Sequence, residues 1–291
     1  MAEKPAACQL CSSLDLVDMF LIDQIQLKRC RHCGLVFVFP LPADEELRTG
    51  YQQKYFQSGD PLHWGYENYL AMDGENRQTA ERRLGILTGF LRGGSLLEVG
   101  CATGLFMQAA QAKGFAAKGV EISDFAAAHG RENYKLDIFT GILRDARFAD
   151  ASFDAVAMWD VLEHVPAPLR DLEEVARVLK SGGYLFLTVP NINSFWARIM
   201  GKNWFGFTKI REHLFYYNRR TITQALSQSG FNVVRIKSSP FLVTLKFLSD
   251  KMGRYSRLLS GWSGKVLKVC RLENKKVNFQ YIDMLVVARK R

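Results

Sequence analysis

From residue 95 onward, short apolar segments typical of strands alternate with segments whose apolar residues have helical spacing. This pattern predicts a parallel β-sheet covered by helices. Five short apolar runs have the composition of buried strands, at residues 95–100, 117–122, 138–141, 153–159 and 184–190. Three segments between them have helical spacing, at residues 105–113, from residue 124 onward, and at residues 169–179. Ser181, Gly182 and Gly183 predict a turn before the last of these strands. Strands that alternate with helices predict a Rossmann-like α/β fold, in which a mostly parallel sheet carries helices on both faces.

Outside this block the periodicity changes, and the changes predict the domain organisation. Residues 191–218 are rich in aromatic residues and glycine, and the basic stretch at residues 241–275 predicts a helical insertion. The remaining elements are a helix and two strands, at residues 219–229, 231–237 and 283–288. We therefore expect a small module over residues 1–45, a helical linker or lid over 46–90, and a main domain over 91–291 with insertions at 191–218 and 241–275.

Length and composition fit a globular protein of this size. The chain has 291 residues, 48% of them hydrophobic, which suffices for one α/β domain and a small module. Residues 1–7 are small or polar, and no apolar run reaches the roughly 18 residues of a membrane span. We therefore expect a cytoplasmic protein, in which paired cysteines bind metal more often than they form disulfides.

Two Cys-x-x-Cys pairs near the N-terminus predict a zinc site. Cys8 and Cys11 form one pair, Cys30 and Cys33 form the other, and 18 residues separate them. That separation falls within the roughly 15–20 residues typical of zinc sites. Each pair can present two thiolates from one tight turn, and Gly34 suits the chain reversal after the second pair. Because all four ligands come from the protein, we expect a structural zinc on which the folding of the small module depends.

The first strand ends in a glycine-rich turn that predicts a nucleoside-binding site. Gly100 and Gly104 lie at its carboxyl end, where the backbone can approach a ligand closely. Glu121 ends the second strand about 20 residues later, where a carboxylate can accept hydrogen bonds from both hydroxyls of a ribose. The Gly-x-x-x-Gly spacing differs from the Gly-x-Gly-x-x-Gly that favours a pyrophosphate, so NAD is the weaker alternative.

Three segments resemble the class I S-adenosylmethionine-dependent methyltransferases. Residues 97–104, Leu-Glu-Val-Gly-Cys-Ala-Thr-Gly, resemble the first motif of the family, Glu/Asp-x-Gly-x-Gly-x-Gly, with Ala102 at the middle glycine. Residues 153–165 resemble the fourth strand and the loop after it, and residues 179–190 the fifth strand with its approach. The resemblance covers roughly residues 75–290 and implies S-adenosylmethionine as methyl donor.

The same resemblance implies which residues hold the donor. Ile142 occupies the position at which many members carry an acidic residue that accepts a hydrogen bond from the adenine amino group. We therefore expect backbone groups near Ile142 and Leu143 to bind the adenine. The full set of expected donor contacts is Glu98, Gly100, Ala102, Gly104, Glu121, Ile122, Ile142, Trp159 and Asp160.

The N-terminal part carries a second resemblance. Residues 30–37, Cys-Arg-His-Cys-Gly-Leu-Val-Phe, are followed by Pro40, Tyr51 and Tyr55. This arrangement is similar to zinc-ribbon methyltransferases common in saccharide and natural-product biosynthesis. It implies a small-molecule or saccharide acceptor, including one linked to a lipid or a nucleotide.

Histidines near the expected donor site are the candidate catalytic residues. Methyl transfer is an in-line displacement, so positioning supplies much of the catalysis, and an oxygen acceptor also needs a general base. His213 follows the fifth strand, where substrate-facing insertions occur in this fold, and is our preferred base, with Glu212 as an orienting partner. A surface or packing role for His213 is an equally consistent alternative. His164, at the end of the fourth strand, is expected to face the donor.

His164 also belongs to a candidate metal motif. Residues 160–164, Asp-Val-Leu-Glu-His, resemble the Glu-x-x-Glu-His that chelates a divalent ion in ubiquinone-type O-methyltransferases and small-RNA end methyltransferases. Asp160, Glu163 and His164 therefore predict either a Mg²⁺ site that stabilises an acceptor alkoxide or a metal-free loop packed around the donor. The shorter Asp160 favours the metal-free interpretation.

The sequence leaves three functions open. The first is a methyltransferase for a small molecule or saccharide. The second is an RNA methyltransferase, since a zinc ribbon and a net charge of +10 also fit nucleic acid, although the first hundred residues contain no dense basic stripe. The third is an inactive binding protein, which the intact Gly100, Gly104 and Glu121 disfavour. The basic residues of 241–276 predict either a solvated helical face or peripheral contact with the inner face of a membrane.

Overall fold

The computed structural model describes residues 7–42, 44–57, 65–66, 68–245, 249, 266–270, 272–273 and 275–291. The larger of its two sheets has seven strands, in the order β10 (Phe231–Thr244), β11 (Lys276–Lys290), β8 (Leu179–Pro190), β7 (Phe153–Trp159), β4 (Gly94–Val99), β5 (Phe115–Glu121) and β6 (Ile138–Thr140). Neighbouring strands are parallel from β8 to β6, whereas β11 runs antiparallel to both β8 and β10.

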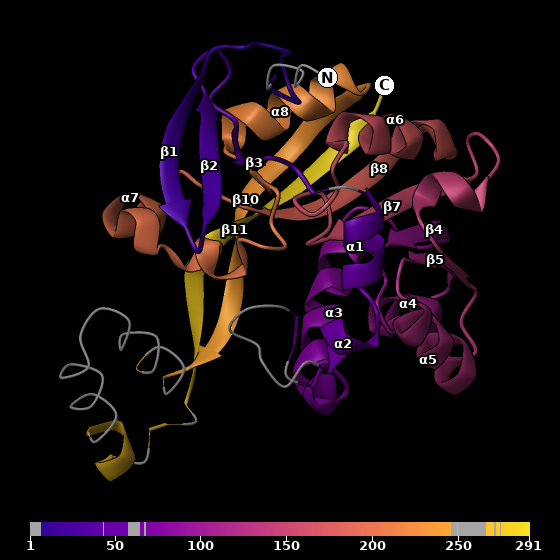
Figure 1. Cartoon of the computed structure of the whole chain (residues 1–291). Coiled ribbons are helices and arrows are strands. Elements are labelled where there is room, and N and C mark those ends of the chain that lie inside the picture. Colours follow the sequence, from indigo (N-terminus) through magenta and orange to yellow (C-terminus); the bar gives the residue numbers. More distant parts are fainter. Residues whose placement is uncertain are drawn as a thin grey trace.

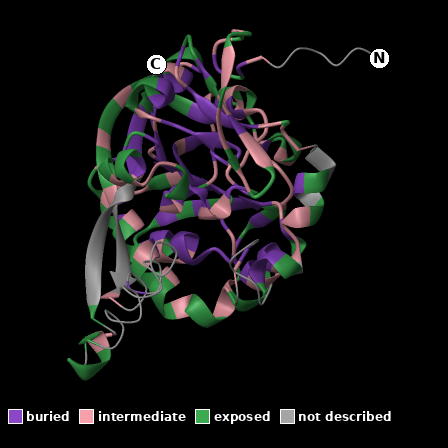
Figure 2. Cartoon of the chain, turned by 60° about the vertical axis from the view of Figure 1, so that its left-hand side comes forward, coloured by how far each residue is buried: buried purple, intermediate pink, exposed green. Residues whose placement is uncertain are grey.

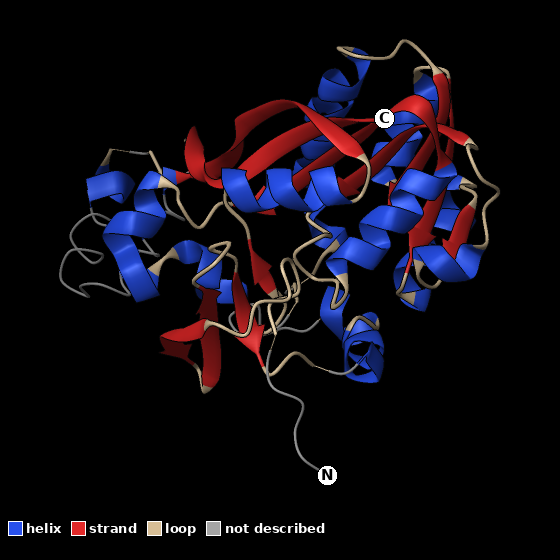
Figure 3. Cartoon of the chain, turned by 90° about the horizontal axis from the view of Figure 1, so that it is seen from above, coloured by secondary structure: helices blue, strands red, loops and turns tan. Residues whose placement is uncertain are grey.

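Helices cover both faces of this sheet (Figures 1 and 3). One face carries α3 (Asp73–Thr88), α4 (Leu105–Ala112) and α5 (Asp124–Tyr134). The other carries α6 (Pro168–Val178) and α8 (Arg219–Gln228). The Rossmann-like, mostly parallel sheet expected from the sequence is therefore confirmed.

Local sequence explains where these helices begin and end. The side chain of Ser123 caps α5 by accepting a hydrogen bond from the Ala126 amide, at 3.5 Å. The side chain of Asn218 caps α8, and Thr221 returns the bond in a capping box. Gly114 follows α4 with a φ of 87°, a left-handed conformation that glycine adopts without strain.

Three segments differ from the sequence expectation. The strand β8 starts at Leu179, so the expected turn at 181–183 lies within it as an irregularity, and the pairing with β7 shifts from Phe153↔Leu179 to Ala155↔Tyr184. The strands β10 and β11 are longer than expected and pair as far as Thr244↔Lys276. Backbone pairing between these strands thus extends the sheet into the segment expected to be helical from residue 241.

The smaller sheet combines three strands from the N-terminal region of the cysteines with one strand from much later in the chain. It has the order β1 (Leu16–Ile22), β2 (Ile25–Cys30), β3 (Val36–Phe39) and β9 (Phe215–Tyr216), all antiparallel. The last strand comes from the far end of the 191–218 segment, almost 180 residues after β3 in the chain. Two segments distant in sequence therefore share one sheet.

Buried residues occur in the strands of both sheets (Figure 2), and one apolar core includes residues of both. Successive residues of β4 point to opposite faces, so Leu96 packs with the core under α3 and α4, and Leu97 with the core under α6 and α8. The second of these cores also includes Phe37 and Phe215 from the smaller sheet. On the other side of the smaller sheet, Tyr216 packs with Trp204 and its neighbours.

Short helices complete the description. Before α3 come α1 (Asp44–Gly50), α2 (Gln53–Phe56) and η1 (Leu70–Met72), and η2 (Leu143–Ala146) follows β6. Between β8 and β9 lie α7 (Phe195–Met200), η3 (Gly201–Asn203) and η4 (Phe205–Lys209). Among the described helices, none combines the length and apolar composition that crossing a bilayer requires. Most of the basic stretch on which the membrane prediction depends, residues 246–248 and 250–265, lies outside the described residues.

Candidate active site and metal centre

A cavity of about 590 Å³ lies at the carboxyl ends of the parallel strands. The loops after β4, β5, β6 and β7 form its floor, because parallel strands bring their carboxyl ends to one edge of the sheet. The helix α3 and a group of tyrosines from the N-terminal third form its other wall. The volume lies within the range of small-molecule sites.

The turn after β4 has the backbone shape that the sequence predicts. Gly100 and Gly104 have φ angles of 70° and 82°, and a Cβ atom on Gly100 would lie 2.5 Å from Cγ2 of Val161. Ala102 also has a left-handed φ, of 49°, which costs about 1–2 kcal/mol for a residue with a Cβ atom. Gly100 and Ala102 line the cavity. Only glycine fits at Gly100, whereas alanine at the middle position is accommodated with strain.

Glu121 ends β5 beside this turn, and its side chain is 5% exposed. One carboxylate oxygen accepts a hydrogen bond from the Ala102 amide at 2.7 Å, and the other from the Ser123 amide at 2.9 Å. Burial raises the pKa of Glu121, and these backbone amides oppose the shift. The carboxylate thus holds the glycine-rich turn against the end of β5 and still lines the cavity.

Glu98 faces the same space from within β4. Its side chain is 3% exposed, and its Oε2 atom has no hydrogen-bond partner in the described structure. Burial raises the pKa of Glu98 to about 8, an effect that Arg83 opposes and Glu121 increases. A buried, unpartnered acceptor in a cavity favours a ligand that carries hydrogen-bond donors or positive charge.

The end of β7 brings Trp159 and Asp160 to the cavity. The Asp160 carboxylate pairs with Arg83 and accepts a hydrogen bond from Thr188 at 2.5 Å. The Arg83 guanidinium carbon lies 5.2 Å from the centroid of the Trp159 ring. Asp160 is therefore engaged by protein groups.

Two more residues that were expected to contact the methyl donor, Ile122 and Ile142, lie in the loops after β5 and β6. Ile122 and Ile142 line the cavity with Gly141 and Leu143. The Gly141 amide donates to the backbone oxygen of Glu121 at 2.8 Å, which holds the loop after β6 against the end of β5. Of the nine residues expected to contact the donor, all except Gly104 line the cavity.

Glu163, His164 and His213 meet at another part of the cavity wall. The two imidazole rings are 4.8 Å apart at an interplanar angle of 84°, and one ligand atom from each of the three residues lies within 4.8 Å of the others. His164 Nδ1 is 2.9 Å from the hydroxyl of Tyr51. Glu163 is 1% exposed, and Glu163 Oε2 and His213 Nδ1 are buried without a hydrogen-bond partner in the described structure.

Burial sets the charge state of this group. It lowers the pKa of His164 to about 4 and lowers the pKa of His213 well below its usual value, with His164 and Lys209 adding to the second shift. It raises the pKa of Glu163 well above the usual carboxyl range, with Asp160 adding to the shift. Near neutral pH both imidazoles are therefore neutral, and each keeps one ring nitrogen without a proton.

Glu212 was expected to orient His213, but the structure places its carboxylate against other groups. Its carboxylate, 1% exposed, accepts hydrogen bonds from the Tyr55 hydroxyl at 2.9 Å and the Gly65 amide at 2.8 Å. It also pairs with the Lys209 ammonium at 3.2 Å. Glu212 thus ties the segment before α3 to the 191–218 segment.

Sequence reasoning missed several residues of this cavity. Lys209 Nζ lies 4.2 Å from the centroid of the Tyr66 ring. Tyr66 in turn stacks edge-on against Tyr69 at 5.0 Å, and both line the cavity with Arg83. These residues come from three separate segments, and no spacing in the sequence marks them as neighbours.

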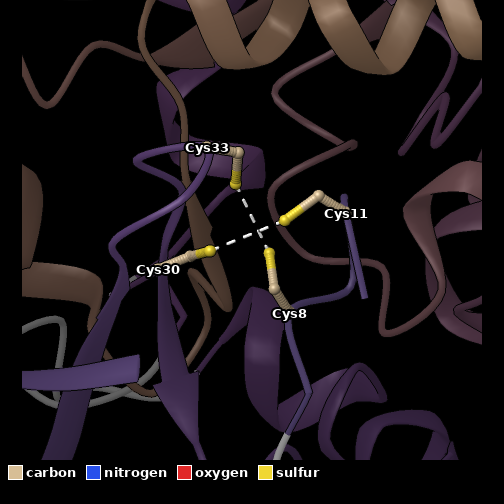
Figure 4. A group of neighbouring side chains, drawn as sticks. All are labelled: Cys8, Cys11, Cys30 and Cys33. Atoms are coloured by element: carbon tan, nitrogen blue, oxygen red, sulfur yellow. Dashed lines mark hydrogen bonds between the residues drawn. The ribbon is translucent and has the colours of Figure 1, made fainter. Parts of the chain in front are cut away.

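The four N-terminal cysteines converge on one point (Figure 4). Cys8 and Cys33 have their sulfurs 3.5 Å apart, and Cys11 and Cys30 have theirs 3.6 Å apart. Tetrahedral zinc with bonds of about 2.3 Å would place its sulfur ligands roughly 3.8 Å apart, so the cluster fits this metal. Gly34 makes the expected reversal with a φ of 87° and donates its amide to the Cys30 oxygen at 2.9 Å.

The fold and the cavity define the class of protein, and comparison with known sequences gives the family. Residues 71–236, more than half of the chain, match the family described as "Methyltransferase domain". The chain therefore belongs to the methyltransferase-domain family and has the fold of class I S-adenosylmethionine-dependent methyltransferases.

Individual relatives agree at the level of the fold. A ubiquinone biosynthesis O-methyltransferase of Paracidovorax citrulli is 33% identical over 121 residues, which are 38% of this chain and 51% of the relative. One from Coxiella burnetii is 33% identical over 112 residues, 35% of this chain and 46% of the relative. The chain thus spans about half the length of the curated relatives it matches.

Solved structures show the fold alone, because their sequence identity is low. A methyltransferase structure from Thermotoga maritima aligns with a TM-score of 0.51 at 19% identity, over 77% of this chain and 94% of its own. The [4+2]-cyclase SpnF aligns with a TM-score of 0.50 at 20% identity, over 73% and 81%.

Proposed function

We propose that this methyltransferase acts on a small-molecule or saccharide acceptor, with His213 as general base. The observation that carries the proposal is the buried, unpartnered Nδ1 of His213 in a cavity whose other wall is rich in tyrosines. The donor half lies at the ends of β4, β5 and β6, and the acceptor half between Glu163, His213 and the tyrosines.

Donor binding is assigned to the turn after β4 and to Glu121. S-adenosylmethionine supplies an electrophilic methyl group on a sulfonium when bound. The bare backbone at Gly100 allows close approach, Glu121 faces the ribose, and backbone groups beside Ile142 face the adenine. Glu98 Oε2 is a free acceptor for the ammonium of a donor of this class.

Acceptor recognition is assigned to the aromatic wall. Tyr51, Tyr55, Tyr66 and Tyr69 line the cavity with aromatic rings, which suit a compact ligand with an apolar face. RNA is the alternative acceptor, so RNA should be incubated with the same labelled methyl donor and tested for incorporated label.

His213 is assigned the removal of the acceptor proton. Burial keeps its imidazole neutral, and its buried Nδ1 has no hydrogen-bond partner in the described structure. The proton of an acceptor hydroxyl would move to Nδ1 while the hydroxyl oxygen forms its bond to the methyl carbon. The carbon–sulfur bond of the sulfonium breaks at the same time, and its electron pair stays on sulfur as a neutral thioether. His164 is held by Tyr51 and packs edge-on against the His213 ring, which fixes the orientation of that ring.

Mass spectrometry of metabolite and glycan extracts incubated with an isotope-labelled methyl donor tests the acceptor class. A labelled small molecule or glycan that depends on the enzyme supports the proposal, and label found only in RNA would refute it. His213→Ala should then lower turnover by about 10²–10⁴ without changing donor affinity. His129→Ala, which changes a half-buried histidine in α5 outside the cavity, is the matched control.

A second candidate is an O-methyltransferase that uses a divalent metal; the two relatives described above are named as O-methyltransferases of ubiquinone biosynthesis. Glu163, His164 and His213 could each offer one ligand to a divalent cation, whereas the expected ligand Asp160 is paired with Arg83 and Thr188. Carboxylate and imidazole suit a transition metal better than Mg²⁺, which prefers oxygen ligands. Activity that vanishes on brief chelation and returns with a divalent metal would favour this candidate over a metal-free base.

A further inference from the structure

In the part of the chain that the structure describes, the short strand β9 connects the four-stranded sheet, which contains Cys30, to the residues beside His213. Val36 and Phe37 of β3 pair with Tyr216 and Phe215 of β9, and the Val38 amide donates to the Leu214 oxygen at 2.9 Å. His213 directly precedes this paired segment. The cysteines Cys30 and Cys33 flank the hairpin turn that leads into β3.

The same strand also holds Glu163. The amides of Leu214 and Phe215 donate to the backbone oxygen of Glu163, at 2.7 and 3.1 Å. Leu214 therefore bonds to β3 through its oxygen and to the loop after β7 through its amide. Residues 214–215 thus hold the backbone of Glu163 directly. They also directly follow His213, whose own amide donates to the Lys209 oxygen at 2.8 Å.

The packing repeats this connection on both faces of the smaller sheet. Phe37 and Phe215 have ring centroids 6.3 Å apart and share a core with Cys8, Cys30 and Cys33. On the other face, Val36 and Val38 share a core with Tyr216, whose ring lies 6.1 Å from that of His213.

The donor-binding groups are held by different hydrogen bonds, although Val99 and Val120 beside them share the apolar core of Cys8, Cys30 and Cys33. The Gly100 amide donates to Val120 at 2.8 Å, and the Glu121 side chain holds the Ala102 amide. These bonds lie within the seven-stranded sheet and its loops. They do not pass through the four-stranded sheet.

We propose that the cysteine-bound metal positions the acceptor half of the active site through β3 and β9, and leaves donor binding to the larger sheet. This inference goes beyond a structural zinc, because it assigns the metal a selective effect within the site. The residues fit zinc by their sulfur spacing, and zinc when bound supplies a rigid tetrahedral link between the two Cys-x-x-Cys turns. Only the naming of this half as the acceptor side rests on the proposed function.

Hydrogen exchange of the full-length protein gives a readout that does not need the acceptor. The metal is removed by a competing chelator or by Cys30→Ser/Cys33→Ser. We expect amides of residues 212–217 to exchange at least about tenfold faster, while amides of β4 and β5 keep their protection. We expect the affinity for S-adenosylhomocysteine, measured by calorimetry, to stay within about twofold. Zinc added back to the chelated protein should restore protection.

Two further variants keep the test decisive if the double variant folds poorly. Phe37→Leu retains the cysteines but reduces the contact with Phe215, so it should retain zinc and still speed exchange at 214–215. Cys270→Ser changes an exposed cysteine outside the cluster and should change nothing. Unchanged exchange at 212–217 after zinc loss would overturn the proposal. So would a parallel loss of donor affinity, because the effect would then be global. His213→Ala tests the proposed function separately and leaves the exchange prediction standing.

Discussion

Replacing the Glu121 carboxylate gives the sharpest test of the donor site. Its two oxygens accept amides of Ala102 and Ser123 at 2.7 and 2.9 Å, and their remaining lone pairs face the cavity. A hydrogen bond to a charged group contributes about 1.5–3 kcal/mol, so Glu121→Ala should weaken S-adenosylhomocysteine binding by about 10- to 150-fold. The same change leaves two backbone amides without their acceptor, so the free energy of unfolding should fall by about 1–3 kcal/mol.

Glu121→Gln separates the two effects. The amide side chain keeps one oxygen acceptor and most of the volume, so it should restore more stability than affinity. Calorimetry with S-adenosylhomocysteine and urea unfolding measure both quantities, and Glu132→Ala, an exposed change in α5, is the control. Equal donor affinity in Glu121→Ala and the wild type, or tighter binding of NAD than of the methyl donor, would refute the reasoning.

The pH dependence of donor binding follows from the same residue. Burial raises the pKa of Glu121, and the ionised carboxylate is the better acceptor for ribose hydroxyls. Donor affinity should therefore rise with pH as this carboxyl ionises, above the usual carboxyl range. The dependence should disappear in Glu121→Gln, and a rise that persists in this variant would assign it to another group.

Three further predictions concern other parts of the molecule. Elemental analysis of protein purified without added metal should find about one zinc per chain, and Cys30→Ser/Cys33→Ser should lose it; zinc retained by that variant would contradict the assignment. Once an acceptor is known, His213→Ala should lower turnover by about 10²–10⁴ at unchanged donor affinity, and near-normal turnover would exclude this base. Burial raises the pKa of Glu98 from 4.5 to about 8, so between these pH values the folded state holds a proton that the unfolded state has lost. The free energy of unfolding should therefore fall as pH rises through this range. Urea unfolding at a series of pH values should show a flatter slope for Glu98→Gln.

Local sequence determined the larger sheet and much of the donor site. Short apolar runs separated by runs with helical spacing can bury their side chains in only a few ways, and the strands β4 to β7 formed close to the expected bounds. The Gly100 turn and Glu121 are local features at the ends of adjacent strands, so topology alone brings them together. The cysteine spacing likewise predicted a cluster because each pair is a local turn.

Tertiary structure decided the acceptor half, because its residues come from segments whose meeting no local pattern encodes. Glu212 was expected to orient His213, but long-range packing places it against Tyr55, Gly65 and Lys209. The pairing of β3 with β9 depends on a two-residue strand that is too short to show a period in the sequence. A short edge strand pairs with the strand that the rest of the fold places next to it. The sequence of either strand alone does not contain that information.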